Sequence, residues 1–174
     1  MYVLVRYILC LIALSPALIY DSRSLNAETK VGQIATSLID VAYHPFANKT
    51  DTESKHSASC ISTVVFSLRR LGFNCAYKDF KVYQQYFKSQ SSLLKVGYTK
   101  SNKKGLILFN NSHFAIYYKD ENSDGRIDVD DLIIHARFHP VKITKIKEWL
   151  IHDPIRPIRV VDLTKNILCP NYDK

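Results

Sequence analysis

The period of the apolar residues changes from helical to strand-like near Gly105. Before this glycine, apolar side chains recur at helical spacing, which predicts amphipathic helices over 30–41, 59–71 and 80–88. After it, short apolar runs between turn residues predict strands over 106–109, 113–118, 132–138 and 158–163, with one more helix over 143–150. Helices that precede strands predict an α+β fold, with helices packed on a central antiparallel β-sheet.

Residues 1–27 differ from the rest of the chain. Positions 2–20 are almost wholly apolar, carry one positive charge at Arg6, and are followed by a polar run. This pattern is typical of a secretory signal peptide that is cleaved after Ala27. An uncleaved membrane anchor is the alternative, but Pro16 interrupts the run, which is shorter than the ~20 residues of a spanning helix. We therefore expect an exported protein, periplasmic or secreted, with a single domain over 28–174.

The cysteines predict one disulfide and one free thiol. Cys10 lies in the predicted signal, so the mature chain keeps Cys60, Cys75 and Cys169. Export favours disulfides, and an odd count leaves at least one thiol over. Cys75 and Cys169 are the natural pair, since they would connect the end of the helix over 59–71 to the C-terminal tail. The alternative is three reduced cysteines without a chemical role.

Cys60 lies in the first turn of the predicted helix over 59–71. The unpaired N–H groups and the dipole at this end stabilise negative charge, so we expect a lowered thiol pKa and a reactive thiolate. His113 opens one predicted strand directly after a turn, and His135 lies in the next strand. If these strands pair, one imidazole can act as base while the other orients it. A buried cysteine and two structural histidines are the alternative.

Three segments resemble NlpC-type cysteine peptidases, and they occur in the order found in that family. Residues 59–72, which begin Ser-Cys-Ile-Ser-Thr-Val-Val, are similar to the family's nucleophile helix. Residues 105–117 are similar to the region of its base strand, and Ile134-His135-Ala136 resembles the strand of its third catalytic residue. The likeness extends over roughly 34–163 and includes the family's closing helix and strand.

The resemblance implies a papain-like fold and hydrolysis of peptide bonds in the stem peptides of peptidoglycan. It makes Cys60 the nucleophile, His113 the general base and His135 the group that orients this base. Tyr43, in the segment before the helix, is the position that the resemblance pairs with a tyrosine lining the family's active site.

The residues that flank Cys60 depart from the family pattern. The family has an acidic residue before the cysteine and a Ser-Gly pair after it, whereas this chain has Ser59, Ile61 and Ser62. Because the acid and the serine help to bind a free peptide amino end, their loss indicates a different target bond. Two other readings stay open: a non-catalytic wall-binding domain on the same fold, and a papain-like acyltransferase or amidase toxin with another substrate.

Residues 120–131 match the pattern of a calcium-binding loop. Gly125 at loop position 6 permits a sharp turn, and Ile127 at position 8 is an apolar anchor. The predicted metal ligands are Asp120, Asn122, Asp124, Arg126 through its carbonyl, Asp128 and Asp131. Since Asp131 replaces the usual bidentate Glu, calcium affinity is expected to be weaker. Bound calcium would set the register of the strands that carry the two histidines. A solvated acidic turn is the alternative.

The charge of the chain favours an anionic partner. The formal net charge is +8 at pH 7, so an exported form is attracted to anionic polymers, and peptidoglycan is the expected partner. The Lys and Arg residues are scattered and match no nucleic-acid recognition module, so no nucleic-acid partner is expected. We expect no membrane partner after removal of the signal, and a monomer.

Overall fold

The computed structural model describes residues 28–94, 105–152 and 157–170. The predicted signal peptide at 1–27 lies outside these ranges, so the choice between a cleaved signal and an anchor stays a prediction. Within the described ranges, no helix has both the length and the apolar character needed to cross a membrane.

Four of the described helices begin at a side-chain cap. Thr29, Asn48, Ser59 and Asp79 each accept a backbone N–H from the first turn that follows. Such caps satisfy N–H groups that have no partner within the helix. The helical elements are α1 (Lys30–Ala35), the 3-10 helix η2 (Thr36–Leu38), α2 (Lys49–Glu53), α3 (Cys60–Arg70), α4 (Phe80–Gln90) and α5 (Ile146–His152).

A six-stranded antiparallel sheet forms the centre of the fold, in the strand order β3-β8-β4-β5-β6-β7. Its strands are β3 (Ser92–Leu93), β4 (Leu106–Phe109), β5 (Phe114–Lys119), β6 (Leu132–His135), β7 (Lys142–Lys145) and β8 (Arg159–Asp162). Two short strands, β1 (Ala42–Tyr43) and β2 (Ser57–Ala58), pair in parallel outside this sheet. The predicted α+β class is therefore confirmed.

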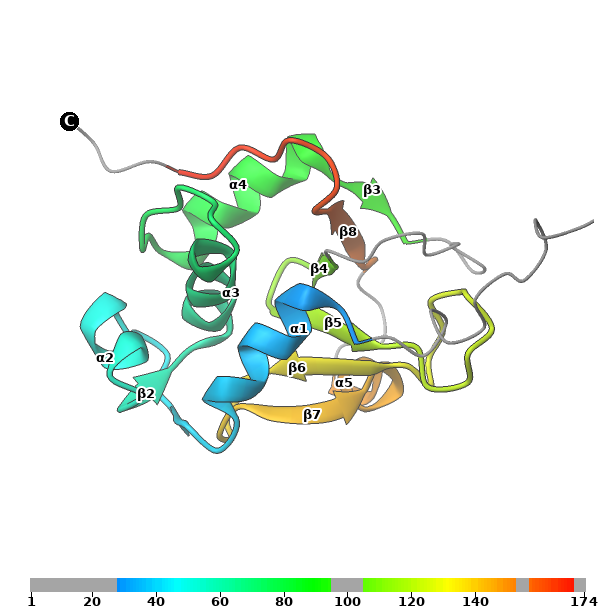
Figure 1. The fold of residues 1–174 in the computed structure, drawn as a ribbon, viewed down its shortest axis with the longest axis horizontal. Coiled ribbons are helices and arrows are strands. Elements are labelled where there is room, and N and C mark those ends of the chain that lie inside the picture. Colours follow the sequence, from blue (N-terminus) through cyan, green and yellow to red (C-terminus); the bar gives the residue numbers. More distant parts are fainter. Residues whose placement is uncertain (1–27, 95–104, 153–156, 171–174) are drawn as a thin grey trace, which may run out of the picture.

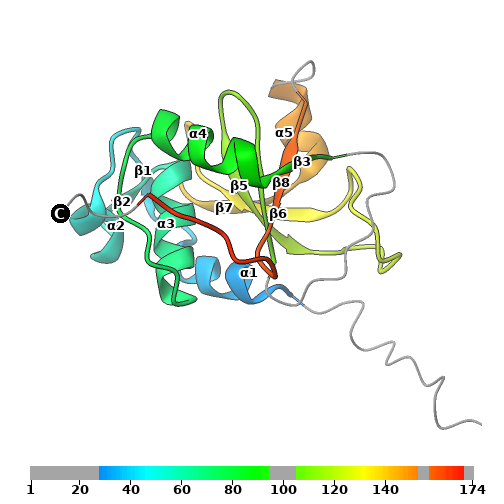
Figure 2. The same cartoon turned by 90° about the horizontal axis from the view of Figure 1, so that it is seen from above.

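Both faces of the sheet are buried, because alternate residues of its central strands enter two different cores. On one face, Ile107 and Phe114 join apolar residues of α1, α3 and α4. On the other face, Leu108 and Tyr117 pack with Trp149 of α5. Figure 1 shows α1 in front of the sheet and α5 behind it, and Figure 2 gives the view from above. The residues that end or precede the central strands are thus held between two packed layers.

Two glycines allow α1 to lie close against the sheet. A Cβ on Gly32 would come within 2.7 Å of Tyr118 Cδ2 in β5, and one on Gly105 within 2.3 Å of Val31 Cγ1. Gly105 also has a φ of +114°, which other residues rarely adopt. The hydroxyl of Thr29 donates to the carbonyl of Tyr117 at 2.6 Å and fastens the start of α1 to β5.

The predicted helix over 30–41 is too long. The α-helix ends at Ala35 and continues only as the 3-10 helix η2. The hydroxyls of Thr36 and Ser37 donate to the carbonyls of Gln33 and Ile34 at 2.6 and 2.9 Å. Short polar side chains that bond to nearby backbone compete with the regular helical pattern, which explains the early end.

The segment after His135 also needs correction. The predicted strand over 132–138 ends at His135, and Phe138 then adopts a positive φ of 54°. The predicted helix over 143–150 begins only at Ile146, because Lys142–Lys145 forms strand β7. This strand pairs with β6 along its whole length, so the open edge of β6 overrides the helical spacing of the local sequence.

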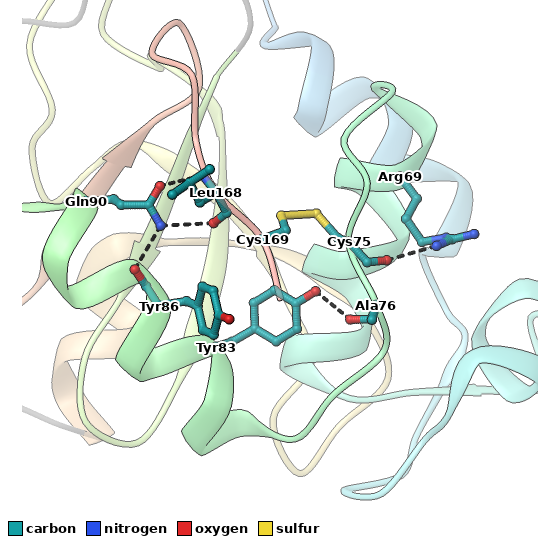
Figure 3. Close-up of a disulfide and its surroundings, with 8 residues drawn as sticks. All are labelled: Arg69, Cys75, Ala76, Tyr83, Tyr86, Gln90, Leu168 and Cys169. Carbon is teal, nitrogen blue, oxygen red and sulfur yellow. Dashed lines mark hydrogen bonds between the residues drawn. A yellow bond between two sulfur atoms is a disulfide. The ribbon is translucent and has the colours of Figure 1, made fainter. Parts of the chain in front are cut away.

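A disulfide joins Cys75 to Cys169 across a sequence separation of 94 residues, which confirms the predicted pair (Figure 3). Cys60 is the free cysteine of the described residues. Near the crosslink, the N–H of Ala76 donates to the carbonyl of Pro170 at 2.8 Å. Gln90 Nε2 donates to the carbonyl of Leu168 at 2.9 Å. The C-terminal tail is therefore fastened to α4 and to the segment that follows α3.

Replacing both crosslinked cysteines by serine should lower the free energy of unfolding by about 2–5 kcal/mol, since the crosslink closes a long loop in the unfolded chain. Urea unfolding followed by circular dichroism measures this difference. Cys60→Ser breaks no crosslink and serves as the matched control, with a stability close to that of the wild type. Equal stability of the wild type and the Cys75→Ser/Cys169→Ser variant would contradict the prediction.

Candidate active site

Cys60 is the first residue of α3, and its neighbours form a capping box around it. Ser59 Oγ accepts the N–H of Ser62 at 3.1 Å, and Ser62 Oγ accepts the N–H of Ser59 at 2.8 Å. The two serines that depart from the NlpC-type pattern therefore hold the start of the helix. Ile61, the third departing residue, is buried in the core. Both serine hydroxyls are thus engaged in the capping box, and the Ile61 side chain is engaged in core packing.

His113 and His135 are joined by a direct hydrogen bond. His113 Nε2 lies 2.7 Å from His135 Nδ1, and the two rings meet edge to face with centroids 4.9 Å apart. His135 Nε2 lies 3.0 Å from Thr144 Oγ1 in β7. The exposed fractions of His113, His135 and Thr144 are 1%, 5% and 5%. A buried hydrogen-bonded chain of three polar side chains thus runs from the start of β5 across β6 to β7. His113 Nδ1 takes no part in these hydrogen bonds.

The sulfur of Cys60 lies beside the start of β5, which His113 directly precedes. The backbone N–H groups of Phe114, Ile61 and Cys60 itself lie close enough to the sulfur to lower the pKa of the thiol. Phe114 belongs to β5 and is adjacent to His113 in the chain, whereas the other two N–H groups belong to the first turn of α3. The structure therefore brings the N-terminus of α3 and the beginning of β5 together, and the pairing of Cys60 with His113 stays a prediction.

The pKa of the Cys60 thiol is raised above its ordinary value of 9.0, chiefly by burial. Backbone hydrogen bonds and the charge of Arg137 lower the pKa but do not reverse this shift. The prediction that the helix N-terminus gives a lowered pKa is therefore wrong in sign, because the loss of hydration outweighs the helix dipole. The thiol of the free protein is neutral at neutral pH.

The two imidazoles are neutral as well. Burial, followed by the charge of His135, lowers the pKa of His113 well below 6.5. Burial also lowers the pKa of His135 to about 3, with further contributions from His139, Lys142 and Arg137. A neutral thiol and a neutral imidazole are the protonation states that general-base catalysis requires, in which the proton moves only when the nucleophile attacks.

Tyr43 lies within electrostatic reach of Cys60. Burial raises the pKa of Tyr43, the charge of Cys60 raises it further, and Arg137 lowers it. The ring of Tyr43 also meets the ring of Phe138 at 5.9 Å between centroids, and Phe138 is 84% exposed. Tyr43 therefore stands at the candidate site, next to an exposed aromatic side chain of the β6–β7 turn.

Three neighbours of the site were not predicted from the sequence. Thr144 contacts His135, the ring of Trp149 lies 5.5 Å from the ring of His113, and Arg137 acts on all the titratable groups of the site. Arg137 follows His135 by two residues, which is a signal only once the end of β6 is known. Nothing in the spacing of Thr144 or Trp149 indicated a contact with the histidines.

The predicted calcium loop, residues 120–131, connects β5 to β6 and is held by its own side chains. Asp120 accepts the N–H groups of Ser123 and Gly125 at 2.7 and 2.8 Å. Asp131 accepts the hydroxyl of Tyr117 at 2.8 Å, and Ile127 is buried in the core on the α5 face. In the part of the chain that the structure describes, no group of three or more His, Cys, Asp or Glu is arranged to hold a metal ion.

No protein-family model matches this chain. Comparison with curated proteins and with solved structures gives no match either. The likeness to NlpC-type peptidases therefore depends on the residues of this sequence alone.

Iodoacetamide should alkylate Cys60 slowly at pH 7 and faster as the pH rises past 9. The reason is that burial raises the thiol pKa and only the thiolate attacks the reagent. Mass spectrometry of the unreduced protein gives the rate at each pH, and Cys60→Ala corrects for labelling elsewhere. Rapid labelling that does not change between pH 6 and 8 would indicate a preformed thiolate instead.

Proposed function

We propose that this protein is a cysteine hydrolase that cleaves amide bonds in the stem peptides of peptidoglycan. Cys60 is the nucleophile, His113 the general base and His135 the group that orients this base. One observation carries the proposal: a free thiol at a helix N-terminus lies beside the start of β5, where the preceding His113 is bonded to His135 at 2.7 Å. Nucleophile, base and orienting group are the parts that covalent catalysis of acyl transfer requires.

The hydrogen bonds of the histidines support a defined tautomer. When His135 Nε2–H donates to Thr144 Oγ1, His135 Nδ1 carries no proton and accepts a hydrogen bond from His113 Nε2–H. His113 Nδ1 then carries no proton and can accept one from the thiol. Thr144 is thus a positioning residue, which acts on the base only through His135.

The reaction follows from these roles. As Sγ of Cys60 attacks the amide carbonyl carbon, the thiol proton passes to His113 Nδ1. The negative charge develops on the carbonyl oxygen, and the N–H groups at the start of α3, which lie close to the sulfur and hence to the carbon it attacks, are the donors that stabilise this oxyanion. The C–N bond then breaks, and His113 returns the proton to the leaving amine. Water, deprotonated by His113, hydrolyses the thioester and releases the acid and the free thiol.

The substrate and the setting of the reaction belong to the same proposal. The resemblance to NlpC-type peptidases supports a papain-like fold and a cell-wall peptide as substrate. The net charge of +8 supports binding to an anionic wall, and the Cys75–Cys169 disulfide is consistent with export to the periplasm or the medium. Since Ser59 and Ser62 bond to each other, a target bond away from a free peptide amino end fits best.

Purified sacculi digested with the wild-type protein should release peptide fragments, whereas Cys60→Ala should release none. His113→Ala should lower the rate by about 10²–10⁴-fold, the range that general acid–base catalysis contributes. Mass spectrometry of the soluble fragments measures both effects and identifies the bond that is cleaved.

His56 is an exposed histidine outside the site, so His56→Ala is the matched control and should digest at the wild-type rate. Thermal melting must show that each variant is folded. Identical digests from the wild type and Cys60→Ala would overturn the proposal and favour a wall-binding domain without catalysis.

We also propose that the loop over 120–131 binds calcium. Its carboxylates at Asp120 and Asp131 are buried, and oxygen donors of this kind suit a hard cation. The loop connects the strands that follow His113 and carry His135, so its cation would stabilise their register.

Calcium should raise the melting temperature of the wild-type protein. At a calcium concentration roughly 100-fold above Kd, the free energy of unfolding should rise by about 2.7 kcal/mol. Asp128→Asn should weaken this gain because it removes a predicted ligand. Asp130→Asn is the matched control, since Asp130 pairs with Lys145 and Lys147 at 3.4 and 2.8 Å and is not a predicted ligand. A melting temperature that calcium and a chelator leave unchanged would remove the calcium proposal without affecting the hydrolase proposal.

A further inference from the structure

A pocket of about 310 Å³ opens beside the histidine pair. Its lining comes from the end of β6, the β6–β7 turn, β7 and α5, and it includes His135 and Thr144. The pocket therefore shares two side chains with the proposed proton path. A cavity of this size can hold one small group of a larger substrate.

Positive charge dominates the lining of this pocket. Arg137 and Lys142 contribute fixed positive charges, and Glu148 is the acidic residue among the lining side chains. The Glu148 carboxylate accepts the backbone N–H of Lys145 at 3.3 Å. Lys142 lies opposite His135 in the β6–β7 pair, so its charge stands next to the site. Two cations and one carboxylate in the lining favour a ligand with negative charge and disfavour a metal ion.

Trp149 lies between the pocket and the general base. Its side chain lines the pocket and is 1% exposed. Its Nε1 is buried and has no hydrogen-bond partner among the described residues, so this N–H does not face a ligand in the pocket. The ring of Trp149 also lies 5.5 Å from the ring of His113, so it links the pocket to the general base.

We propose that this pocket binds an oxyanion group of the substrate, a carboxylate of the peptide, through Arg137 and Lys142. This inference deepens the hydrolase proposal and rests on it for the identity of the substrate. A carboxylate offers the charge that the two cations attract and oxygens that accept their N–H groups. Its capture beside His135 would hold the peptide next to the histidine pair.

Trp149 is the single tryptophan of the chain, so its fluorescence reports directly on the pocket. The probes are muropeptides released from sacculi, the same muropeptides after chemical amidation of their carboxyl groups, and inorganic phosphate. Each is titrated into Cys60→Ala protein, in which no turnover occurs. Lys142→Gln and Arg137→Gln are then added to this background. Lys165→Gln is the charge-matched control, because Lys165 is exposed, follows β8 and does not line the pocket.

Native muropeptides should change the Trp149 fluorescence and bind roughly tenfold more tightly than the amidated ones, as expected for one charge-assisted hydrogen bond. Lys142→Gln should lower the affinity for native muropeptides by a similar factor and leave the affinity for amidated muropeptides unchanged. Lys165→Gln should change neither affinity. Because Lys142 is exposed, this variant should fold normally, which melting temperatures check, and Arg137→Gln repeats the test from the other cation.

Equal affinity for native and amidated muropeptides, or equal affinity of Lys142→Gln and its parent, would overturn the carboxylate pocket. If phosphate binds only when Lys142 is present and muropeptides do not displace it, the pocket is assigned to a phosphate group instead. Digestion of sacculi by the wild type with no effect of Lys142→Gln would remove the pocket but keep the hydrolase. Lys142-dependent binding without any digestion would remove the hydrolase but keep the pocket.

Discussion

The pairing of β5 with β6 is the constraint on which the candidate site depends. Ile116 lies opposite Ile134 and Tyr117 opposite Ile133, so the end of β6 reaches the beginning of β5 and His135 meets His113. The next pair places His135 opposite Lys142 and brings Thr144 to the other nitrogen of His135. A slip of one residue would turn His135 to the opposite face of the sheet, and both contacts would be lost.

Burial decides the chemistry of the groups that this pairing brings together. Loss of hydration raises the pKa of Cys60 and lowers that of His113, so both are neutral in the free protein. A neutral pair avoids the cost of two buried charges, which an ion pair would have to offset. Trp149 connects the candidate site to the adjacent pocket, because its ring contacts His113 and it also lines that pocket.

Much of the fold could be predicted because local spacing is a strong signal. The helix over 59–71 and the strand over 106–109 have the expected bounds within one residue, since each has a clear apolar period. The segment 142–145 could not be predicted, because its pairing partner, β6, outweighs its own helical spacing. For the candidate site, Cys60, His113, His135 and Tyr43 were predicted from their residue types and the motif they resemble. Thr144, Trp149 and Arg137 were missed because only their contacts distinguish them from ordinary residues.

The sequence by itself determined the α+β order of elements and placed the start of α3 within one residue of Cys60, because these depend on residue spacing. It named Cys75 and Cys169 as the natural pair but left three reduced cysteines as an alternative. The tertiary structure alone decided that Ser59 and Ser62 bond to each other, that β7 extends the sheet, and that the thiol pKa rises. The physical reason is that burial and strand pairing join residues far apart in the chain, and their electrostatic and hydrogen-bond effects outweigh local preferences.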